Sequence, residues 1–186
     1  MFPDFPELNH SQLEQLRTHC ELLLHWNRKL NLISVHTEAD IIKRHYYESL
    51  FLGRHLPKYA VKIADIGSGA GFPGFIVAIQ RPDCAVTLIE SHQRKAVFLR
   101  EVSRDIPNIR VLAQRAEDVN ERFDWAISRA VRYEDIRGAM QKFAPNAALL
   151  TGDVSPSDLP GYDWKEPIQL PWGERRLLYV SRSDES

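Results

Sequence analysis

The sequence predicts an α/β fold: a seven-stranded, mainly parallel sheet with helices on both faces and a helical N-terminal extension. From residue 61 onward, short apolar segments alternate with helical segments, which is typical of buried parallel strands. A glycine-rich turn follows the first of these strands, and residues 1–30 have a helical pattern. The 186 residues suffice for one domain and leave little room for a second. We therefore expect 1–186 to be a single domain, with the extension over 1–57 and the α/β core over 58–186.

The N-terminal extension is predicted to contain two helices. A capping box over residues 11–14 opens the first helix, in which leucines and Cys20 recur at helical spacing and form an apolar face for core packing. A second capping-box pattern, over 37–40, opens the helical stretch that follows it. This stretch ends near Gly53, with Pro57 beyond it.

The elements of the core are predicted from changes in hydrophobic period. The expected strands are 61–66, 84–90, 109–113, 123–128, 147–151, 164–170 and 175–181, and the expected helices are 72–80, 91–105 and 133–143. The last two strands are joined by a short turn-like segment, which favours an antiparallel pair at the end of the sheet.

Composition excludes several classes of protein. The chain is 44% hydrophobic and 26% charged, unlike disordered, collagen-like or disulfide-scaffold proteins. No apolar stretch approaches the length of a membrane span, and the first residues lack a signal-peptide pattern, so we expect a cytoplasmic protein with no membrane association. Cys20 and Cys84 lie far apart and outside any CxxC pattern, which favours buried, reduced thiols over a bridge, a metal site or a nucleophile.

Net charge restricts the possible partners only weakly. A formal charge of −1 argues against a protein that coats nucleic acid through a general basic field. Arginines nevertheless outnumber lysines by 17 to 7, and arginine is suited to binding phosphates and stacking on bases. Surface ion pairing explains the same bias, and from charge alone it is the favoured interpretation.

The glycine-rich turn over 65–74 is the strongest motif. Gly69, Gly71 and Gly74 fit G-x-G-x-x-G, in which a pyrophosphate rests on a helix N-terminus. Starting from Asp65, the run also fits D-x-G-x-G-x-G, which is similar to the first motif of the S-adenosylmethionine-dependent methyltransferases. A carboxylate would repel a pyrophosphate but is compatible with a ligand that carries an ammonium and a sulfonium, so Asp65 favours the second interpretation. The structural alternative is a tight turn with no ligand.

Glu90 closes the second predicted strand, where a carboxylate can accept hydrogen bonds from both hydroxyls of a ribose. Nicotinamide and methionine cofactors share this feature, so Glu90 does not discriminate between them. On its own, Glu90 is equally well explained as a surface residue.

Motifs over nearly the whole chain resemble the bacterial 16S ribosomal RNA guanine-N7 methyltransferases, the family of glucose-inhibited division protein B. The matching segments are 26–35, 44–45 with 48–49, 65–74, 88–99, 115–117, 127–130 and 173–177. The resemblance implies a class I, Rossmann-like methyltransferase that uses S-adenosylmethionine and methylates N7 of a guanine in the 530-loop region of 16S ribosomal RNA. The expected partner is 16S ribosomal RNA or the small ribosomal subunit, with no obligate protein partner and a monomer favoured.

The resemblance also implies a role for each matching residue. The expected cofactor-binding residues are Asp65, Gly67, Gly69, Gly71, Phe72, Glu90, Ala116, Glu117 and Arg129. Within this set, Gly67 and Phe72 would line the methionine end, Glu90 would hold the ribose, and Ala116 and Glu117 would border the adenine. Asn31, Arg44, His45 and Arg129 would form the wall that faces the RNA. We expect no metal and assign no general base, since guanine N7 already carries an unprotonated lone pair and its methylation mainly demands alignment.

The residues of the RNA-facing wall also have plain structural explanations. Asn31 could cap the first helix, and His45 could be a satisfied, partly buried histidine. Arg44 could pair with Asp40 or Glu48 at helical spacing.

Two departures from the family pattern leave other functions open. Thr151 stands where the pattern has a lysine, and segment 153–160 is short for a further helix. The two departures favour a small-molecule methyltransferase as the alternative enzyme. Two further alternatives are a nicotinamide-dependent oxidoreductase, which Gly69, Gly71 and Gly74 suggest, and a non-catalytic ribosome-assembly factor.

Overall fold

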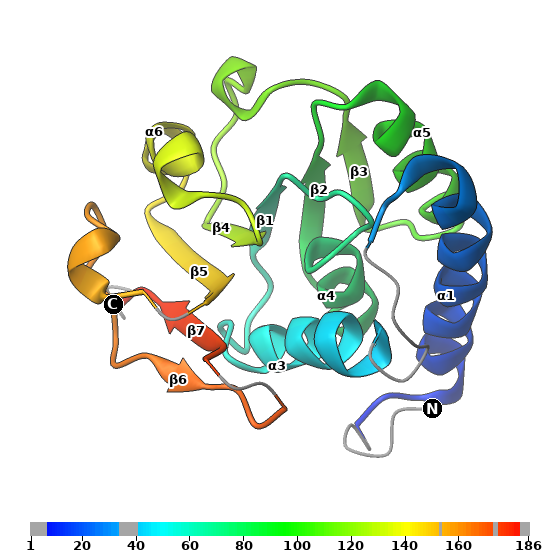
Figure 1. Ribbon diagram of the computed structural model, residues 1–186, viewed down its shortest axis with the longest axis horizontal. Coiled ribbons are helices and arrows are strands. Elements are labelled where there is room, and N and C mark those ends of the chain that lie inside the picture. The colour runs from blue at the N-terminus through cyan, green and yellow to red at the C-terminus, as the bar shows by residue number, and fades with distance from the viewer. Residues whose placement is uncertain (1–6, 34–40, 153, 173–174, 183–186) are drawn as a thin grey trace.

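The computed structural model describes residues 7–33, 41–152, 154–172 and 175–182. Its core is a seven-stranded sheet in the order β3-β2-β1-β4-β5-β7-β6 (Figure 1). The strands are β1 (Lys62–Ile66), β2 (Ala85–Ile89), β3 (Ile109–Leu112), β4 (Trp125–Arg129), β5 (Asn146–Thr151), β6 (Ile168–Gln169) and β7 (Leu177–Val180). Strands β1 to β5 are parallel, whereas β7 is antiparallel to both β5 and β6. The predicted fold class and antiparallel final pair are confirmed.

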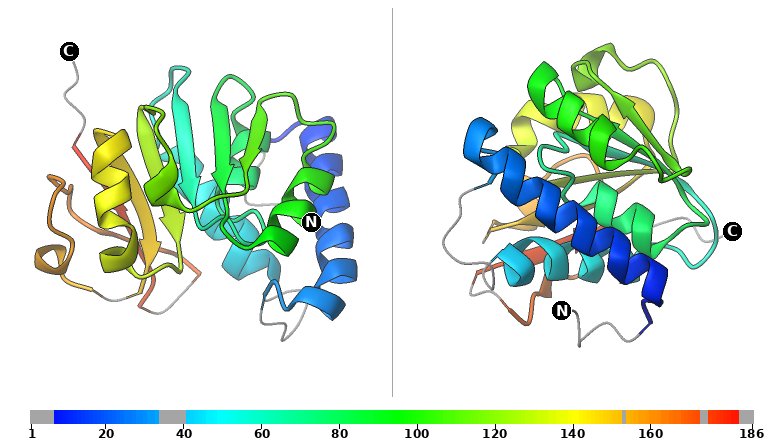
Figure 2. Two further views of the ribbon diagram at one scale, coloured as in Figure 1. Left: turned by 90° about the horizontal axis from the view of Figure 1, so that it is seen from above. Right: turned by 90° about the vertical axis from the view of Figure 1, so that its right-hand side faces the viewer.

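Helices cover both faces of the sheet (Figure 2). One face carries α1 (His10–Leu30), α3 (Glu48–Arg54), α4 (Gly74–Gln80) and α5 (Gln93–Val102), and the other carries α6 (Tyr133–Phe143) with the short 3-10 helix η2 (Ala116–Asp118). A π-helical segment, η1 (Ile42–Tyr47), leads directly into α3. Between β5 and β6, the only helical element of the described residues is the 3-10 turn η3 (Pro156–Asp158), in agreement with the shortness of this segment.

The central strands send their side chains alternately to two apolar clusters, as the two-residue period of a strand requires. Ile63, Leu88 and Ile127 face the cluster beneath α1, α3, α4 and α5, whereas Ala64 and Ala126 face the cluster beneath α6. All five side chains are fully buried. Burial of each large aliphatic side chain contributes about 2 kcal/mol to the free energy of folding. The loops at the strand ends are therefore attached to a well-packed sheet.

The first helix begins earlier than its predicted capping box. Asn9 is the N-cap: its side-chain oxygen accepts from the Gln12 N–H at 3.0 Å, and the Gln12 side chain accepts from the Asn9 N–H at 2.9 Å. Ser11 lies inside the helix, so the prediction over 11–14 was wrong. Asn-x-x-Gln and Ser-x-x-Glu are both capping-box patterns, here two residues apart, and the sequence alone does not choose between them. The second capping box, over 37–40, lies outside the described residues.

Strand β6 is much shorter than the predicted strand 164–170. Pro167 lacks the N–H that a ladder requires, and β6 begins only after it. Trp164 forms an isolated bridge with Ser181, which preserves one further point of contact with the end of β7.

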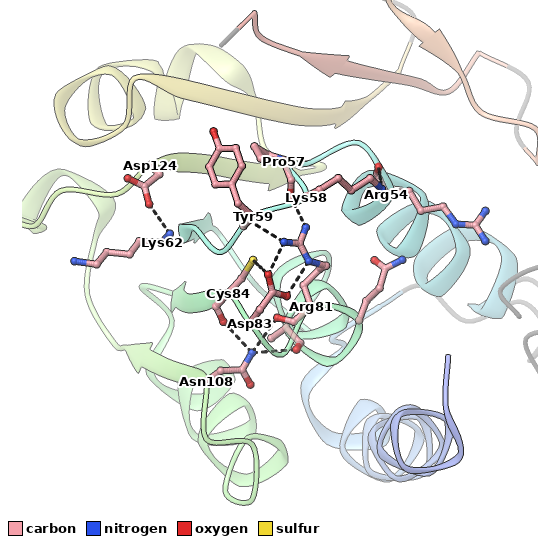
Figure 3. Close-up of polar contacts among 12 residues, drawn as sticks. Arg54, Pro57, Lys58, Tyr59, Lys62, Arg81, Asp83, Cys84, Asn108 and Asp124 are labelled. Atoms are coloured by element: carbon pink, nitrogen blue, oxygen red, sulfur yellow. Dashed lines mark hydrogen bonds and ion pairs between the residues drawn. The ribbon is translucent and has the colours of Figure 1, made fainter. Parts of the chain in front are cut away.

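Polar side chains fasten the end of the sheet at which the strands begin (Figure 3). The Arg81 guanidinium donates to the carbonyl oxygens of Pro57 at 2.6 Å and Tyr59 at 3.0 Å. The Asn108 amide donates to the carbonyl oxygen of Ala78 at 3.0 Å, near the carboxyl end of α4. These bonds satisfy backbone acceptors and tie neighbouring loops together.

The two cysteines are buried and reduced, as their positions in the sequence predict. Neither Cys20 nor Cys84 forms a disulfide. Within the described ranges, no helix is long and apolar enough to span a bilayer.

Candidate functional site

The glycine loop leaves the carboxyl end of β1 and turns into α4. Gly67, Gly69 and Gly71 have φ angles of 71°, 54° and 93°, a region that favours glycine. A Cβ on Gly67 would lie 2.7 Å from Val131 Cγ2, and one on Gly71 would lie 2.9 Å from Phe75 Cβ. A Cβ on Gly69 would have the Gly67 carbonyl oxygen, at 3.7 Å, as its nearest neighbour. The backbone at Gly69 therefore borders open space and can be approached closely by a ligand.

Asp65 lies beneath this loop rather than in the space above it. Its fully buried carboxyl accepts from the Gly74 N–H at 3.1 Å. Burial raises the pKa of Asp65 to about 7, although hydrogen bonds from Ser68 and Gly74 oppose the shift. Because the carboxyl is buried under the loop and binds its backbone, its charge is not presented to a ligand. Asp65 therefore does not indicate that the ligand is cationic.

Glu90 follows β2 and projects beside the loop. One carboxylate oxygen accepts from the Gly69 N–H at 2.9 Å, and the other accepts from the His92 N–H at 2.7 Å. Each oxygen keeps a further lone pair. Glu90 can therefore accept additional hydrogen bonds from two neighbouring hydroxyls.

Three adjacent cavities lie at the carboxyl ends of the parallel strands, and Val131 lines all of them. The first, of about 410 Å³, is bordered by the glycine loop, Glu90 and Arg129. The second, of about 230 Å³, lies between the end of β2 and residues 114–117. The third, of about 320 Å³, lies between the end of β5 and the start of α6. Ligands of open α/β sheets bind at this edge, where the loops that follow the strands converge.

Most of the predicted cofactor-binding residues meet at these cavities. Of the predicted residues, those that line the first or second cavity are Gly67, Gly69, Phe72, Glu90, Ala116, Glu117 and Arg129. Asp65 and Gly71 line neither, since both lie on the inner side of the loop.

A buried ionic cluster holds Arg129 at the cavity wall. Arg129 Nε donates to Glu48 Oε2 at 3.0 Å, and its Nη2 donates to the Arg44 carbonyl oxygen at 2.8 Å. Arg176 Nη2 donates to the same Glu48 oxygen at 2.8 Å. The side chains of Glu48 and Arg129 are only 3% and 8% exposed. Burial lowers the pKa of Arg129, while Glu48 opposes the shift. The single carboxylate of Glu48 thus pairs with the two guanidiniums of Arg129 and Arg176, so the cluster has a net positive charge beside the cavity.

His45 lies between this cluster and the glycine loop. Its ring is tilted against Phe72, with the ring centroids 4.9 Å apart, and its Nδ1 is buried without a hydrogen-bond partner among the described residues. Burial and the charges of Arg129, Arg44 and Arg176 lower the pKa of His45 to about 3. The imidazole is therefore neutral at pH 7 and adds no positive charge to an RNA-facing surface.

Asn31 and Arg44 lie outside the cavity linings. Asn31 is the C-cap of α1, in left-handed conformation, and its N–H donates to the Asn27 carbonyl oxygen at 3.2 Å. The capping alternative therefore holds for Asn31. The side chains of Asn31 and Arg44 are both exposed, and Arg44 contributes its carbonyl oxygen to the Arg129 cluster.

Sequence reasoning missed Ala130 and Val131. Ala130 follows β4 with a φ of 59°, and it lines the first and third cavities. A non-glycine residue in this conformation costs about 1 kcal/mol, and such residues concentrate at functional sites. Neither residue type signals this role, because alanine and valine occur mainly as core residues.

Comparisons with known sequences identify relatives. A family model described as rRNA small subunit methyltransferase G matches residues 12–148. The chain is similar to proteins named ribosomal RNA small subunit methyltransferase G from Halorhodospira halophila (39% identity over 77% of this chain and 70% of the relative), Chromobacterium violaceum (38%, 67% and 61%) and Clostridium beijerinckii (38%, 67% and 56%). The chain thus spans less than two thirds of the length of the second and third relatives.

Solved structures support the fold independently. A SAM-dependent methyltransferase from Aquifex aeolicus matches with a TM-score of 0.56 at 11% identity, over 77% of this chain and 93% of that one. The fibrillarin pre-rRNA processing protein from Methanococcus jannaschii matches with a TM-score of 0.56 at 16% identity, over 67% and 66%. At such low identity the likeness establishes the fold alone, which is that of the S-adenosylmethionine-dependent methyltransferases.

Proposed function

The chain belongs to the ribosomal RNA small subunit methyltransferase G family, and from this premise we propose that it transfers the methyl group of S-adenosylmethionine to N7 of a guanine in the 530-loop region of 16S ribosomal RNA. The observation that carries the proposal is the set of adjacent cavities around the glycine loop, Glu90 and Arg129, at the ligand-binding edge of a methyltransferase fold. We propose that 1–186 acts as a single domain and as a monomer. Its ribosomal substrate would place it in the cytoplasm.

The residues at the first two cavities fit the methyl donor. The open side of Gly69 admits a ligand close to the backbone, and Glu90 can accept from two vicinal hydroxyls. The positive charge of Arg129 suits the carboxylate of the methionine part of the donor. The second cavity, with Ala116 and Glu117, suits a purine ring. When bound, S-adenosylmethionine supplies an electrophilic methyl group on a sulfonium.

The groups around the cavities also suit an acceptor that needs no base. Guanine N7 carries an in-plane lone pair and no proton. His45, with its pKa lowered to about 3, is a very weak base, and Glu90 is assigned to the vicinal hydroxyls of the methyl donor. The remaining tasks of the protein are to align the guanine with the methyl group and to exclude water, which proximity and a desolvated pocket achieve.

The third cavity is our candidate for the target guanine. It shares Ala130 and Val131 with the first cavity, so a base held there would lie next to the methyl donor. A base must leave its stack to enter such a cavity, which favours an unpaired segment of RNA. The exposed side chains of Arg44, Arg132 and Arg175 are available to contact phosphates.

The decisive experiment is methyl transfer from labelled S-adenosylmethionine to small ribosomal subunits that lack this methylation. We expect incorporation at one guanine, mapped by chain cleavage at N7-methylguanine. Incorporation only into small acceptors would favour the small-molecule methyltransferase. Binding to the subunit without turnover would favour the assembly factor, and tight binding of a nicotinamide cofactor would favour the oxidoreductase.

Arg129→Ala tests the site itself. We expect methyl transfer to fall by about a hundredfold, equivalent to about 2.7 kcal/mol of transition-state stabilisation, because the variant loses the charge at the wall of the first cavity. Calorimetric titration of the donor and a thermal melt of the variant would separate lost binding from lost folding. Unchanged turnover in a folded variant would remove Arg129 from the site.

A further inference from the structure

A buried histidine connects the N-terminal helix to the glycine loop. His19, in α1, is 1% exposed. Its Nε2 lies 2.9 Å from the carbonyl oxygen of Ala70, the residue between Gly69 and Gly71. Its Nδ1 lies 2.7 Å from the hydroxyl oxygen of Tyr46, in η1. One ring therefore joins three segments that are distant in the sequence.

The two partners determine the tautomer of His19. A carbonyl oxygen only accepts, so Nε2 carries the proton and donates to Ala70, while Nδ1 accepts from the Tyr46 hydroxyl. Burial lowers the pKa of His19 to about 4, although the bond to Ala70 opposes the shift. The neutral ring thus has one donor and one acceptor, and both are used.

The same ring packs directly under the loop. It stacks on Phe75 with centroids 4.4 Å apart and meets Phe72 edge-on at 5.5 Å. A Cβ on Gly71 would lie only 3.2 Å from His19 Nε2. Phe72 lines the first cavity, so the ring contacts a residue of the cavity wall as well as the loop backbone.

From this juxtaposition we propose that His19 and Tyr46 are positioning residues, which hold the glycine loop from the N-terminal extension and thereby set the affinity for the methyl donor. The inference rests on the proposed function, since it takes the loop as the binding site of S-adenosylmethionine. Loss of the bond to Ala70 frees the centre of the loop, which must then be ordered when the ligand binds. We therefore expect the Kd to rise by about tenfold, which corresponds to about 1.4 kcal/mol and lies within the range for a buried acceptor that loses its donor.

Two substitutions at one position separate the two ring nitrogens. In His19→Gln the side-chain amide can replace Nε2 and donate to Ala70. In His19→Asn the shorter amide can replace Nδ1 but does not reach Ala70. We expect the Kd of S-adenosylmethionine, measured by calorimetry, to stay within about twofold of wild type for His19→Gln and to rise about tenfold for His19→Asn. Tyr46→Phe, which frees the ring to reorient, should fall between them.

Leu23→Ala is the matched control. Leu23 is fully buried on the same helix and belongs to the core cluster that contains Phe72 and Phe75, the two rings that His19 contacts. This variant should lower the Tm at least as much as His19→Asn and leave the Kd unchanged. If Leu23→Ala weakens binding as much as His19→Asn does, the effect is merely structural and the proposal is overturned. Equal Kd values for His19→Asn, His19→Gln and wild type would also overturn it.

Hydrogen exchange in the ligand-free protein provides a second test that needs no methyl donor. We expect the amides of residues 69–72 to exchange faster in His19→Asn than in wild type or His19→Gln. The ¹⁵N shifts of the His19 ring should show a protonated Nε2 and an unprotonated Nδ1. If wild type fails to bind S-adenosylmethionine, the proposed function is wrong, and exchange still decides whether His19 positions the loop. Unaltered exchange, or an Nδ1–H tautomer, would overturn the positioning role.

Discussion

The fold buries the ionisable side chains of Glu48, Arg129 and Asp65, and burial has a different consequence for each of them. Glu48 forms ion pairs with two guanidiniums, and it holds Arg129 at the cavity wall. No counter-ion contacts Asp65 among the residues that the structure describes, and burial raises its pKa to about 7. The sequence and its family resemblance indicated roles for Asp65 and Arg129 and suggested Glu48 only as a possible partner of Arg44, but the surroundings determine what each group does.

Glu48→Gln tests the buried cluster. The substitution leaves Arg129 and Arg176 beside each other without a counter-charge, so we expect a loss of about 3 kcal/mol in the free energy of unfolding, measured with urea, together with reduced methyl transfer. Glu7→Gln is the control, because Glu7 pairs with Arg54 at the surface and should contribute less than about 1 kcal/mol. A Glu48→Gln protein as stable as the control variant would contradict this account.

Asp65→Asn tests the buried carboxyl through pH. The folded-state pKa is raised from 3.8 to about 7, so the folded protein binds the proton more tightly than the unfolded chain. Wild-type stability should therefore fall as the pH rises from about 4 to 7, by about 1.4 kcal/mol per pH unit, and then level off. Asparagine keeps an acceptor for the Gly74 amide and does not titrate. Relative to Asp65→Asn, wild type should lose about 2 to 3 kcal/mol between pH 5 and pH 8 in chemical denaturation. Parallel stability curves for the two proteins would refute the raised pKa.

At the scale of elements, the segments that position the site are the least regular ones. Segment η1 is π-helical and ends where Glu48 begins α3, so it presents the Arg44 carbonyl oxygen and His45 toward the cavity wall. π-Helical turns are rare and often occur at functional sites. The loop after β4 places Ala130 in a left-handed conformation in the same region. The regular strands form the sheet, and these irregular segments determine where the residues at the cavities lie.

The cap of α1 gives a prediction at this scale. Asn9→Ala removes the side-chain acceptor of the Gln12 amide and should lower the free energy of unfolding by about 1 kcal/mol. Ser11→Ala should change it by only a few tenths of a kcal/mol, since Ser11 is an exposed residue inside the helix. Thermal or urea unfolding of the two variants measures the difference. A larger loss for Ser11→Ala would restore the cap that the sequence suggested.

For the whole molecule, the near-zero net charge limits how RNA can be bound. With a formal charge of −1, affinity must come from a few local contacts rather than from a general field. The candidate contacts are Arg44, Arg132 and Arg175, near a set of cavities that lie on one edge of the sheet. Specificity then depends on the shape of the RNA and on the cavity that receives the base.

The near-zero net charge predicts that the affinity for RNA depends only weakly on salt concentration. Three phosphate contacts to unpaired RNA give a slope of about −2 in log affinity against log salt concentration. Thr151→Lys adds a cation at the third cavity and should steepen the slope by about 0.7. Fluorescence anisotropy with a labelled fragment of 16S ribosomal RNA measures both. A wild-type slope steeper than about −5 would show a broad basic surface instead.

Sequence alone determined the strand order along the chain, the alternation with helices, the glycine loop and the acid after β2. These features depend on local period and turn chemistry, which neighbouring residues set. The final antiparallel pair was also predicted, although Pro167 shortened β6 to two residues. The capping box was placed wrongly because two overlapping capping-box patterns, over 9–12 and 11–14, occur at the start of the helix.

Tertiary structure decided which of these residues reach a ligand. It put Asp65 under the loop and Glu90 beside it, although both are acids at strand ends. It joined Glu48, Arg129 and Arg176 into one buried cluster, and it placed His19 beneath the loop. Such outcomes depend on burial and on contacts between distant segments. The free energy of a charged or polar side chain is set by the partners that remain after water has been removed, and those partners are known only once the chain has folded.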